Sequence, residues 1–139
     1  MTGVPVTDKP LPYPTPKTQP FWDALKEHRI DIQQCDDCHK WVFFPRLHCP
    51  HCFSRSLSWR TVSGEGELHT FTLARLPTLP ELADEAPQKL AVVQLDEGPH
   101  LNTTLVGVEE GEIRVGMRVK PVFDDIVPGE VTLLRYTAA

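Results

Sequence analysis

The second half of the chain alternates short apolar runs with turn-forming residues. From Thr61 onward, runs rich in Val, Leu and Thr are separated by Gly, Pro and acidic residues, which is typical of strands in an all-β unit. Five strands are predicted, at residues 66–76, 90–97, 100–108, 117–124 and 130–136. We therefore expect a mainly β protein.

The first predicted strand changes the phase of its apolar face. Leu68 is followed by Phe71 and Leu73, so the inward face shifts between residues 68 and 71, which predicts a bulge or a sharp bend. The link LDEGPH after the second strand is short enough for a hairpin. Five strands in about eighty residues, the first long and bent, favour a small OB-type barrel over residues 61–139. A sandwich fragment is the alternative, although an immunoglobulin-like sandwich needs about 100 residues.

A short amphipathic helix is predicted before the barrel, over residues 18–30. Thr18 is a candidate N-cap, Pro20 falls in the first turn, and Phe21, Trp22 and Leu25 share one face. The helix is expected to end near Arg29 or Ile30. Six prolines in residues 1–20 remove backbone donors and favour an extended tail over residues 1–17, either a strap or a loose end.

Four cysteines lie between the helix and the barrel, and they are all the cysteines of the chain. They form two C-x-x-C pairs, Cys35 with Cys38 and Cys49 with Cys52, separated by ten residues. Two such knuckles facing each other supply four sulfurs in a tetrahedron, which suits Zn²⁺ or a single iron. We expect a structural zinc ribbon over residues 31–60, with zinc favoured over iron. Four sulfur ligands leave no open coordination position, so this metal would support folding rather than catalysis.

Other uses of the four thiols remain open at this stage. Two disulfides would suit a secreted chain, and a redox-active C-x-x-C would need a βαβ context that the surrounding residues do not show. A rubredoxin-like electron carrier would place iron on the same sulfurs. Three histidines lie close by and could replace a sulfur, but with four thiols present they are expected at the surface or behind the ligands: His39, His48 and His51.

The loop between the knuckles is unusually apolar, with the sequence WVFFP at residues 41–45. A ribbon this small has almost no interior, so these side chains either pack on the barrel and helix or form a partner surface. We take Trp41, Phe43 and Phe44 as candidate partner contacts. Lys40 and Arg46 rim the same loop and are candidates for contact with a phosphorylated ligand.

Charge divides the chain into two parts. Residues 1–60 carry eight Lys or Arg and six Asp or Glu, a net charge of +2, while residues 61–139 carry six and thirteen, a net charge of −7. The overall charge of −5 disfavours nucleic acid and anionic membranes as partners. No apolar leader opens the chain and no apolar run reaches about 18 residues, so a soluble cytoplasmic protein is expected.

No catalytic motif is recognisable in the sequence. The serines of residues 54–63 lie in no G-x-S-x-G turn. Gly64-Glu65-Gly66 has His69 where a dinucleotide loop needs its third glycine, so it is interpreted as the bend that enters the first strand. We therefore expect a chain that is not catalytic alone.

Five segments together resemble a known family in order and spacing: PFWDALKEHRIDIQQCDDC, FFPRLHCPHC, SGEGELHTFTLAR, VVQLDEGP and IRVGMRV. It is the acyl-CoA-associated OB-fold family with an N-terminal rubredoxin-like zinc ribbon, known as domain of unknown function thirty-five. The resemblance runs from about Pro20 to Tyr136. Glycine commonly follows the second cysteine of each pair in this family, whereas His39 and Phe53 stand there in this chain, which predicts distorted knuckle turns.

The resemblance implies an accessory subunit. Family members accompany thiolase-fold enzymes, including lipid-transfer-type thiolases and aldolases that act on acyl-CoA, and some accompany hydratases. It implies that the four cysteines bind the metal, that Arg46 and the aromatic loop are contact candidates, and that the assembly is a heterotetramer whose CoA site the chain helps to shape. Steroid side-chain or aromatic acyl-CoA degradation is the implied setting. A single-stranded nucleic-acid-binding module and an electron carrier remain as rivals.

Overall fold

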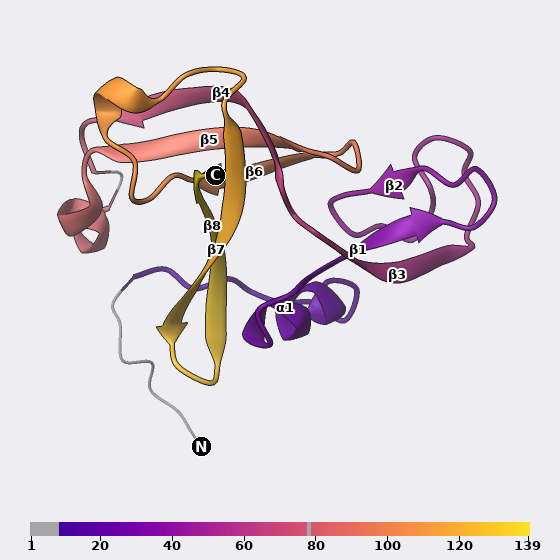
Figure 1. Cartoon of the computed structure of the whole chain (residues 1–139). Coiled ribbons are helices and arrows are strands. Elements are labelled where there is room, and N and C mark those ends of the chain that lie inside the picture. The colour runs from indigo at the N-terminus through magenta and orange to yellow at the C-terminus, as the bar shows by residue number, and fades with distance from the viewer. Residues whose placement is uncertain (1–8, 78) are drawn as a thin grey trace.

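The computed structural model describes residues 9–77 and 79–139 and contains two antiparallel sheets and one α-helix. In Figure 1 the helix lies below β4, β5 and β6 and beside the lower part of the β7–β8 hairpin, and the smaller sheet projects to one side. The ribbon region contains α1 (Gln19–Lys26), β1 (Ile30–Cys35), β2 (Trp41–Val42) and β3 (Leu57–Val62). The barrel contains β4 (Gly66–Ala74), β5 (Gln88–Leu95), β6 (His100–Thr104), β7 (Arg118–Val127) and β8 (Val131–Ala138), with short 3-10 helices η1 (Pro80–Glu85) and η2 (Glu110–Glu112).

The larger sheet has the strand order β6-β5-β4-β7-β8, which confirms the predicted mainly β, OB-like architecture. Its two edge strands approach each other at one parallel bridge, between Leu105 and Tyr136. There the Val106 N–H donates to the Tyr136 carbonyl at 2.8 Å. The sheet therefore curves toward closure without a continuous ladder between β6 and β8 in the described residues.

The predicted irregularity in the first barrel strand is confirmed. The register of β4 against β5 shifts between Leu68 and Thr70, so His69 is the additional residue of a bulge. The predicted hairpin is present as well, because β5 and β6 pair in register from Leu90 with Thr104 to Gln94 with His100. The phase change of the apolar residues was a sufficient signal for the bulge.

The last two strands extend further than predicted, to Val127 in β7 and to Ala138 in β8. Strand β7 continues to Val127 rather than ending at residue 124, because the carboxylates of Asp124 and Asp125 are bound within the hairpin. Asp124 accepts a hydrogen bond from Arg135 at 2.7 Å, and Asp125 accepts one from Thr132. Conversely, β6 ends at Thr104 rather than 108, because the chain then turns to meet β8.

The α-helix also ends earlier than predicted, at Lys26. His28 adopts a positive φ of 59°, and the N–H groups of His28 and Arg29 donate to the carbonyls of Leu25 and Ala24. This is a Schellman ending with histidine where glycine is usual, so the sequence lacked the ordinary stop signal. Thr18 occupies the N-cap position, but its hydroxyl bonds to Thr15 and not to the helix.

The described part of the predicted tail is a strap rather than a loose end. Lys9 lies 2.6 Å from a carboxylate oxygen of Glu85 and 3.3 Å from one of Asp84, which ties it to the η1 loop of the barrel. Residues 1–8 of the predicted tail lie outside the described residues. No helix in the described part is long and apolar enough to cross a membrane.

One apolar core connects the helix, the ribbon strand β1 and the barrel. Phe21 and Leu25 from α1 and Ile30 and Ile32 from β1 share it with barrel residues such as Val93. The ribbon has a second, much smaller core in which Cys35, Val42 and Cys49 are buried. The metal end of the ribbon therefore has little apolar packing of its own.

Candidate metal centre and its apolar surroundings

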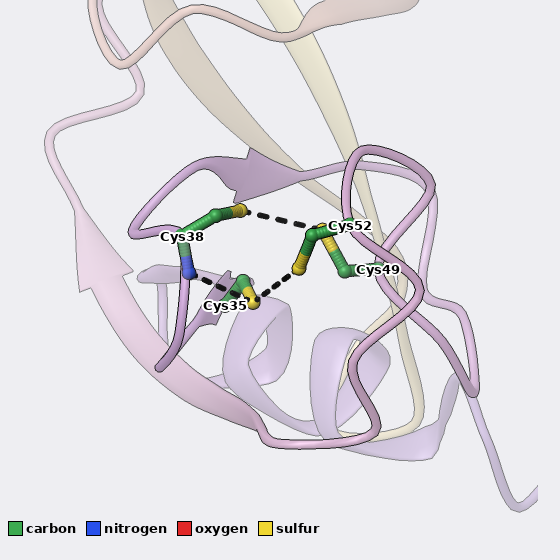
Figure 2. A group of neighbouring side chains, drawn as sticks. All are labelled: Cys35, Cys38, Cys49 and Cys52. Carbon is green, nitrogen blue, oxygen red and sulfur yellow. Dashed lines mark hydrogen bonds between the residues drawn. The ribbon is translucent and has the colours of Figure 1, made fainter.

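The four cysteine sulfurs point toward one another from the two knuckles, as Figure 2 shows. All four Sγ atoms lie within 4.8 Å of one another, and the Cys35–Cys52 and Cys38–Cys49 distances are both 3.6 Å. A tetrahedral site with Zn–S bonds of about 2.3 Å places its sulfurs about 3.8 Å apart. The cluster therefore fits one four-coordinate metal ion.

Both knuckle turns are regular, contrary to the expectation of distortion. The His39 N–H donates to the Cys35 carbonyl at 2.9 Å, and the Phe53 N–H donates to the Cys49 carbonyl at 2.8 Å. His39 and Phe53 both have φ of 64°, the left-handed conformation that glycine adopts more easily. The two turns therefore keep the usual knuckle geometry, although His39 and Phe53 must adopt a backbone conformation that is unfavourable for non-glycine residues.

Backbone N–H groups also point at the sulfurs. The Cys38 N–H lies 3.4 Å from Cys35 Sγ, and the His51 N–H lies 3.4 Å from Cys49 Sγ. The Cys38 N–H, with further hydrogen bonds, lowers the pKa of Cys35 to about 7. Backbone hydrogen bonds also lower the pKa of Cys49, whereas burial and the neighbouring sulfurs raise the pKa of Cys38 and Cys52. Because thiolates rather than thiols bind metal, Cys35 and Cys49 are the two cysteines that deprotonate more readily.

The three neighbouring histidines do not join the sulfur cluster, which among the described residues contains only the four cysteines. His39, His48 and His51 are exposed. His48 instead accepts a hydrogen bond from the side chain of Arg55 at 3.0 Å. Their position agrees with the expectation of surface residues.

The candidate partner contacts of the inter-knuckle loop have different environments. Trp41 and Phe43 are partly buried against the main core, and the Phe43 ring makes an edge-to-face contact with the Phe21 ring at 5.5 Å between ring centres. Phe44 is 45% exposed. Part of the apolar loop is thus explained by packing within the chain, and Phe44 is the most accessible of the three candidates.

The candidate phosphate contacts, Lys40 and Arg46, are both exposed. The backbone of Arg46 is fixed by the buried side chain of Gln33, whose amide oxygen accepts the Arg46 N–H at 2.8 Å. The Gln33 amide nitrogen donates in turn to the Arg46 carbonyl at 3.0 Å. Gln33 thus anchors the loop, a role that the sequence did not reveal, because Gln33 is one of two successive glutamines, Gln33 and Gln34.

An apolar groove of about 540 Å³ lies where the helix, the inter-knuckle loop and the two barrel edges meet. Its walls include Phe21, Trp22, Phe43, Phe44, Leu134 and Arg135. These residues come from α1, the inter-knuckle loop and β8, and β6 adds others such as Asn102, so no local sequence pattern could have identified the groove. Phe44 connects it with the exposed surface of the ribbon.

Comparison with known proteins agrees with this architecture. The family profile "ChsH2, rubredoxin-like zinc ribbon domain" matches residues 22–58, and "ChsH2, C-terminal OB-fold domain" matches residues 59–124. The first profile includes all four cysteines. The metal centre is therefore a structural metal-binding site of the zinc-ribbon type.

Relatives with known names cover most of the chain. It is 37% identical over 125 residues to a "Probable enoyl-CoA hydratase alpha subunit" of Thermomonospora curvata. The matched region covers 79% of this chain but only 38% of the length of that relative. It is 36% identical over 104 residues to a "DUF35 domain-containing scaffold protein" of Pyrococcus furiosus, covering 73% of the chain and 74% of the relative.

A solved structure is similar over nearly the whole length. A chain of the "Ltp2-ChsH2(DUF35) aldolase" superposes with a TM-score of 0.80 at 31% identity, covering 91% of this chain and 98% of that one. The two family profiles, the scaffold-protein relative and this structure agree on both parts of the chain and on their order. The chain therefore belongs to the DUF35 family, in which a ChsH2-type zinc ribbon precedes an OB-fold domain.

Proposed function

We propose that this chain is a non-catalytic accessory subunit that binds and stabilises a thiolase-fold enzyme acting on acyl-CoA. The observation that carries the proposal is the similarity of nearly the whole chain to a chain of the Ltp2-ChsH2(DUF35) aldolase. The names of the relatives, a scaffold protein and an enoyl-CoA hydratase alpha subunit, support the same class of role. The acyl group, for which the family resemblance suggests a steroid side chain or an aromatic acid, stays a prediction.

The polar side chains of the described residues also favour a non-catalytic role. The Thr132 hydroxyl donates to Asp125, and Asp125 also bonds with His28 Nε2 at 3.1 Å. The only base that the hydroxyl contacts in this cluster is the Asp125 carboxylate, and hydrogen bonds from Thr132 and His28 lower its pKa. A carboxylate with a lowered pKa is a weak base and is poorly suited to activate a hydroxyl as a nucleophile. This cluster joins the end of α1 to the last hairpin instead.

Within this function, we assign zinc to the four sulfurs and a folding role to the metal. Cys35, Cys38, Cys49 and Cys52 would be its ligands, because they supply four thiolates at tetrahedral spacing. Zinc is preferred over iron because nothing in the role of an accessory subunit requires electron transfer. A metal held in this way fixes the loops that carry the exposed ribbon surface.

Direct contact with CoA and a heterotetrameric assembly are finer parts of the proposal. Lys40 and Arg46 are exposed cations beside the aromatic loop, where they would attract the phosphates of CoA. The apolar groove bordered by Phe44 lies next to this loop. Two copies of the chain would bind one dimer of the partner.

The experiment that tests the function is purification of the full-length tagged chain from its native cells, followed by separation and reassembly. We expect a thiolase-type protein in stoichiometric amount, and we expect its CoA-thioester turnover to fall when the chain is removed and to return when it is added back. A partner whose stability and turnover are the same with and without the chain would contradict the proposal.

The electron-carrier and nucleic-acid alternatives give other results in the same preparation. Iron in the sulfur site, with a visible absorption that bleaches on reduction, would favour the first. Binding of single-stranded oligonucleotide that weakens steeply with salt would favour the second. The net charge of −7 over residues 61–139 gives the barrel little attraction for nucleic acid.

A further inference from the structure

The second knuckle presents two large apolar side chains to solvent. Leu47 is 67% exposed and Phe53 is 77% exposed. Phe53 also holds a left-handed backbone conformation, with φ of 64°, which a non-glycine residue adopts at a cost of about 1–2 kcal/mol. Neither the backbone nor the packing of this chain therefore accounts for a phenylalanine at this position.

The surroundings of Phe53 are basic. Between Cys38 and Gly64 the chain contains Lys40, Arg46, Arg55 and Arg60 and no Asp or Glu, a net charge of +4. The rest of the chain therefore carries a net charge of −9. The two carboxylates just before this segment reduce its positive charge, so residues 36–63 together carry a net charge of +2. Asp36 accepts a hydrogen bond from Ser58 and lies 3.8 Å from Arg60, and Asp37 accepts one from Ser54.

The second knuckle is also accessible. Figure 1 shows the loops of the ribbon projecting to one side of the molecule, away from the barrel strands. Arg55 and His48, joined by their 3.0 Å hydrogen bond, are exposed in the same knuckle region as Leu47 and Phe53. We call Leu47, His48, Phe53 and Arg55 the second-knuckle surface.

We infer that the second-knuckle surface is a docking site for an acidic, apolar face of the partner protein. The inference rests on the proposed function and names the part of the chain that faces the partner. A large exposed aromatic residue bordered by arginine has the composition of an interface centre. Charge complementarity then requires carboxylates on the partner around an apolar pocket for Phe53.

A nucleic acid fits this surface less well than an acidic protein does. Oligonucleotide binding in ribbon and OB proteins needs a basic groove that follows the backbone over several nucleotides. Here the positive charge stops at the ribbon, since residues 61–139 carry −7. An aliphatic side chain such as Leu47 also gives no stacking face for a base.

The test measures the affinity of the metal-loaded full chain for the thiolase-type subunit that is isolated with it, at about 50 mM and about 300 mM salt. Phe53→Gly removes the side chain, and glycine adopts the positive φ of this position easily. The metal content and the melting temperature of the variant should therefore equal those of the wild type. We expect it to raise the dissociation constant by about tenfold or more. Arg55→Glu should weaken binding strongly at low salt and less at high salt.

Two variants serve as controls. His39→Gly makes the same backbone change at the equivalent position of the first knuckle, also at φ of 64°, and should change the affinity by less than about twofold. Leu76→Ser removes an apolar side chain on the barrel that is 83% exposed, and it should likewise leave the affinity unchanged.

Three results would overturn the inference. If Phe53→Gly and Arg55→Glu bind as tightly as the wild type, the docking surface lies elsewhere while the accessory function stands. If Leu76→Ser weakens binding and Phe53→Gly does not, the barrel is the docking site. If Phe53→Gly weakens binding of a fluorescent single-stranded oligonucleotide but not of the protein, the surface serves nucleic acid. Failure of the wild-type chain to bind any thiolase-type subunit would contradict the proposed function itself.

Discussion

At the scale of single residues, Tyr136 joins the last strand to the turn that leads into the barrel. Its side chain is fully buried, and its hydroxyl donates to the Gly64 carbonyl. Burial raises the pKa of Tyr136, so the residue stays a neutral donor at any physiological pH. Gly64 itself has φ of 76°, and a Cβ there would lie 2.2 Å from Ile30 Cδ1, so this turn requires glycine.

Replacement of Tyr136 by phenylalanine tests this contact. The variant leaves the Gly64 carbonyl buried without its donor, which should lower the free energy of unfolding by about 1–3 kcal/mol. Denaturant unfolding of the metal-loaded protein measures the change. Tyr13→Phe is the matched control, because Tyr13 is 93% exposed and should show no change. An equal effect of the two variants would contradict the assigned role.

Asp125 links the end of α1 to the last hairpin and makes stability depend on pH. Hydrogen bonds from Thr132 and then His28 lower the pKa of Asp125 below its ordinary value. The folded state therefore binds this proton less readily than the unfolded state does. The resulting stabilisation is complete above the unfolded pKa, near about 4, and is lost as pH falls through the folded value.

The variant Asp125→Asn removes this titration. We expect it to be less stable than the wild type at pH near 7, and we expect the difference to shrink as the pH falls through about 4 toward 3. Urea unfolding of both proteins at each pH gives the comparison, and metal release in acid affects both alike. A difference that stays constant over this range would show that Asp125 does not act through its charge.

At the scale of elements, features that depend on local sequence patterns could be predicted from the sequence. Features that depend on contacts between distant residues could not. The shift from Leu68 to Phe71 was enough to locate the bulge, and the C-x-x-C spacing was enough to bring four sulfurs together. The end of α1 was misplaced because His28 takes a conformation that usually calls for glycine. The extension of β7 was missed because Asp124 pairs with Arg135, a residue of the next strand.

The close contact between β4 and β5 gives an element-scale prediction. A Cβ on Gly66 would lie 2.2 Å from the Gln94 carbonyl oxygen, so Gly66→Ala must push the two strands apart. We expect it to lower the free energy of unfolding by about 1–3 kcal/mol. Gly111→Ala, which meets nothing within 4 Å, is the control. Equal stability of Gly66→Ala and the wild type would show that the strands can separate freely.

Metal removal should affect the two sheets differently. The ribbon has only three residues in its own buried core, so it depends on the metal for order. In the metal-free protein, or in Cys49→Ser, amide exchange over residues 35–58 should accelerate by about a hundredfold or more. The barrel strands β4, β5, β7 and β8 should remain protected. Equal protection of the ribbon with and without metal would contradict a folding role for the site.

At the scale of the whole molecule, the chain is polarised in charge. The ribbon end carries the positive segment and the exposed aromatic residues Phe44 and Phe53, while the barrel is acidic and its exposed apolar residues, such as Leu76 and Val115, are aliphatic. The groove between helix, ribbon loop and barrel lies next to this end. This distribution agrees with the proposed accessory role, in which the ribbon end would contact the partner.

The mass of the assembled particle tests the central claim most directly. Sedimentation of the 15.7 kDa chain with an equimolar amount of its thiolase-type partner should give one species that contains two copies of each protein. The free chain should be absent from the profile at micromolar concentration. A chain that sediments alone at its monomer mass in the presence of the partner would contradict the account.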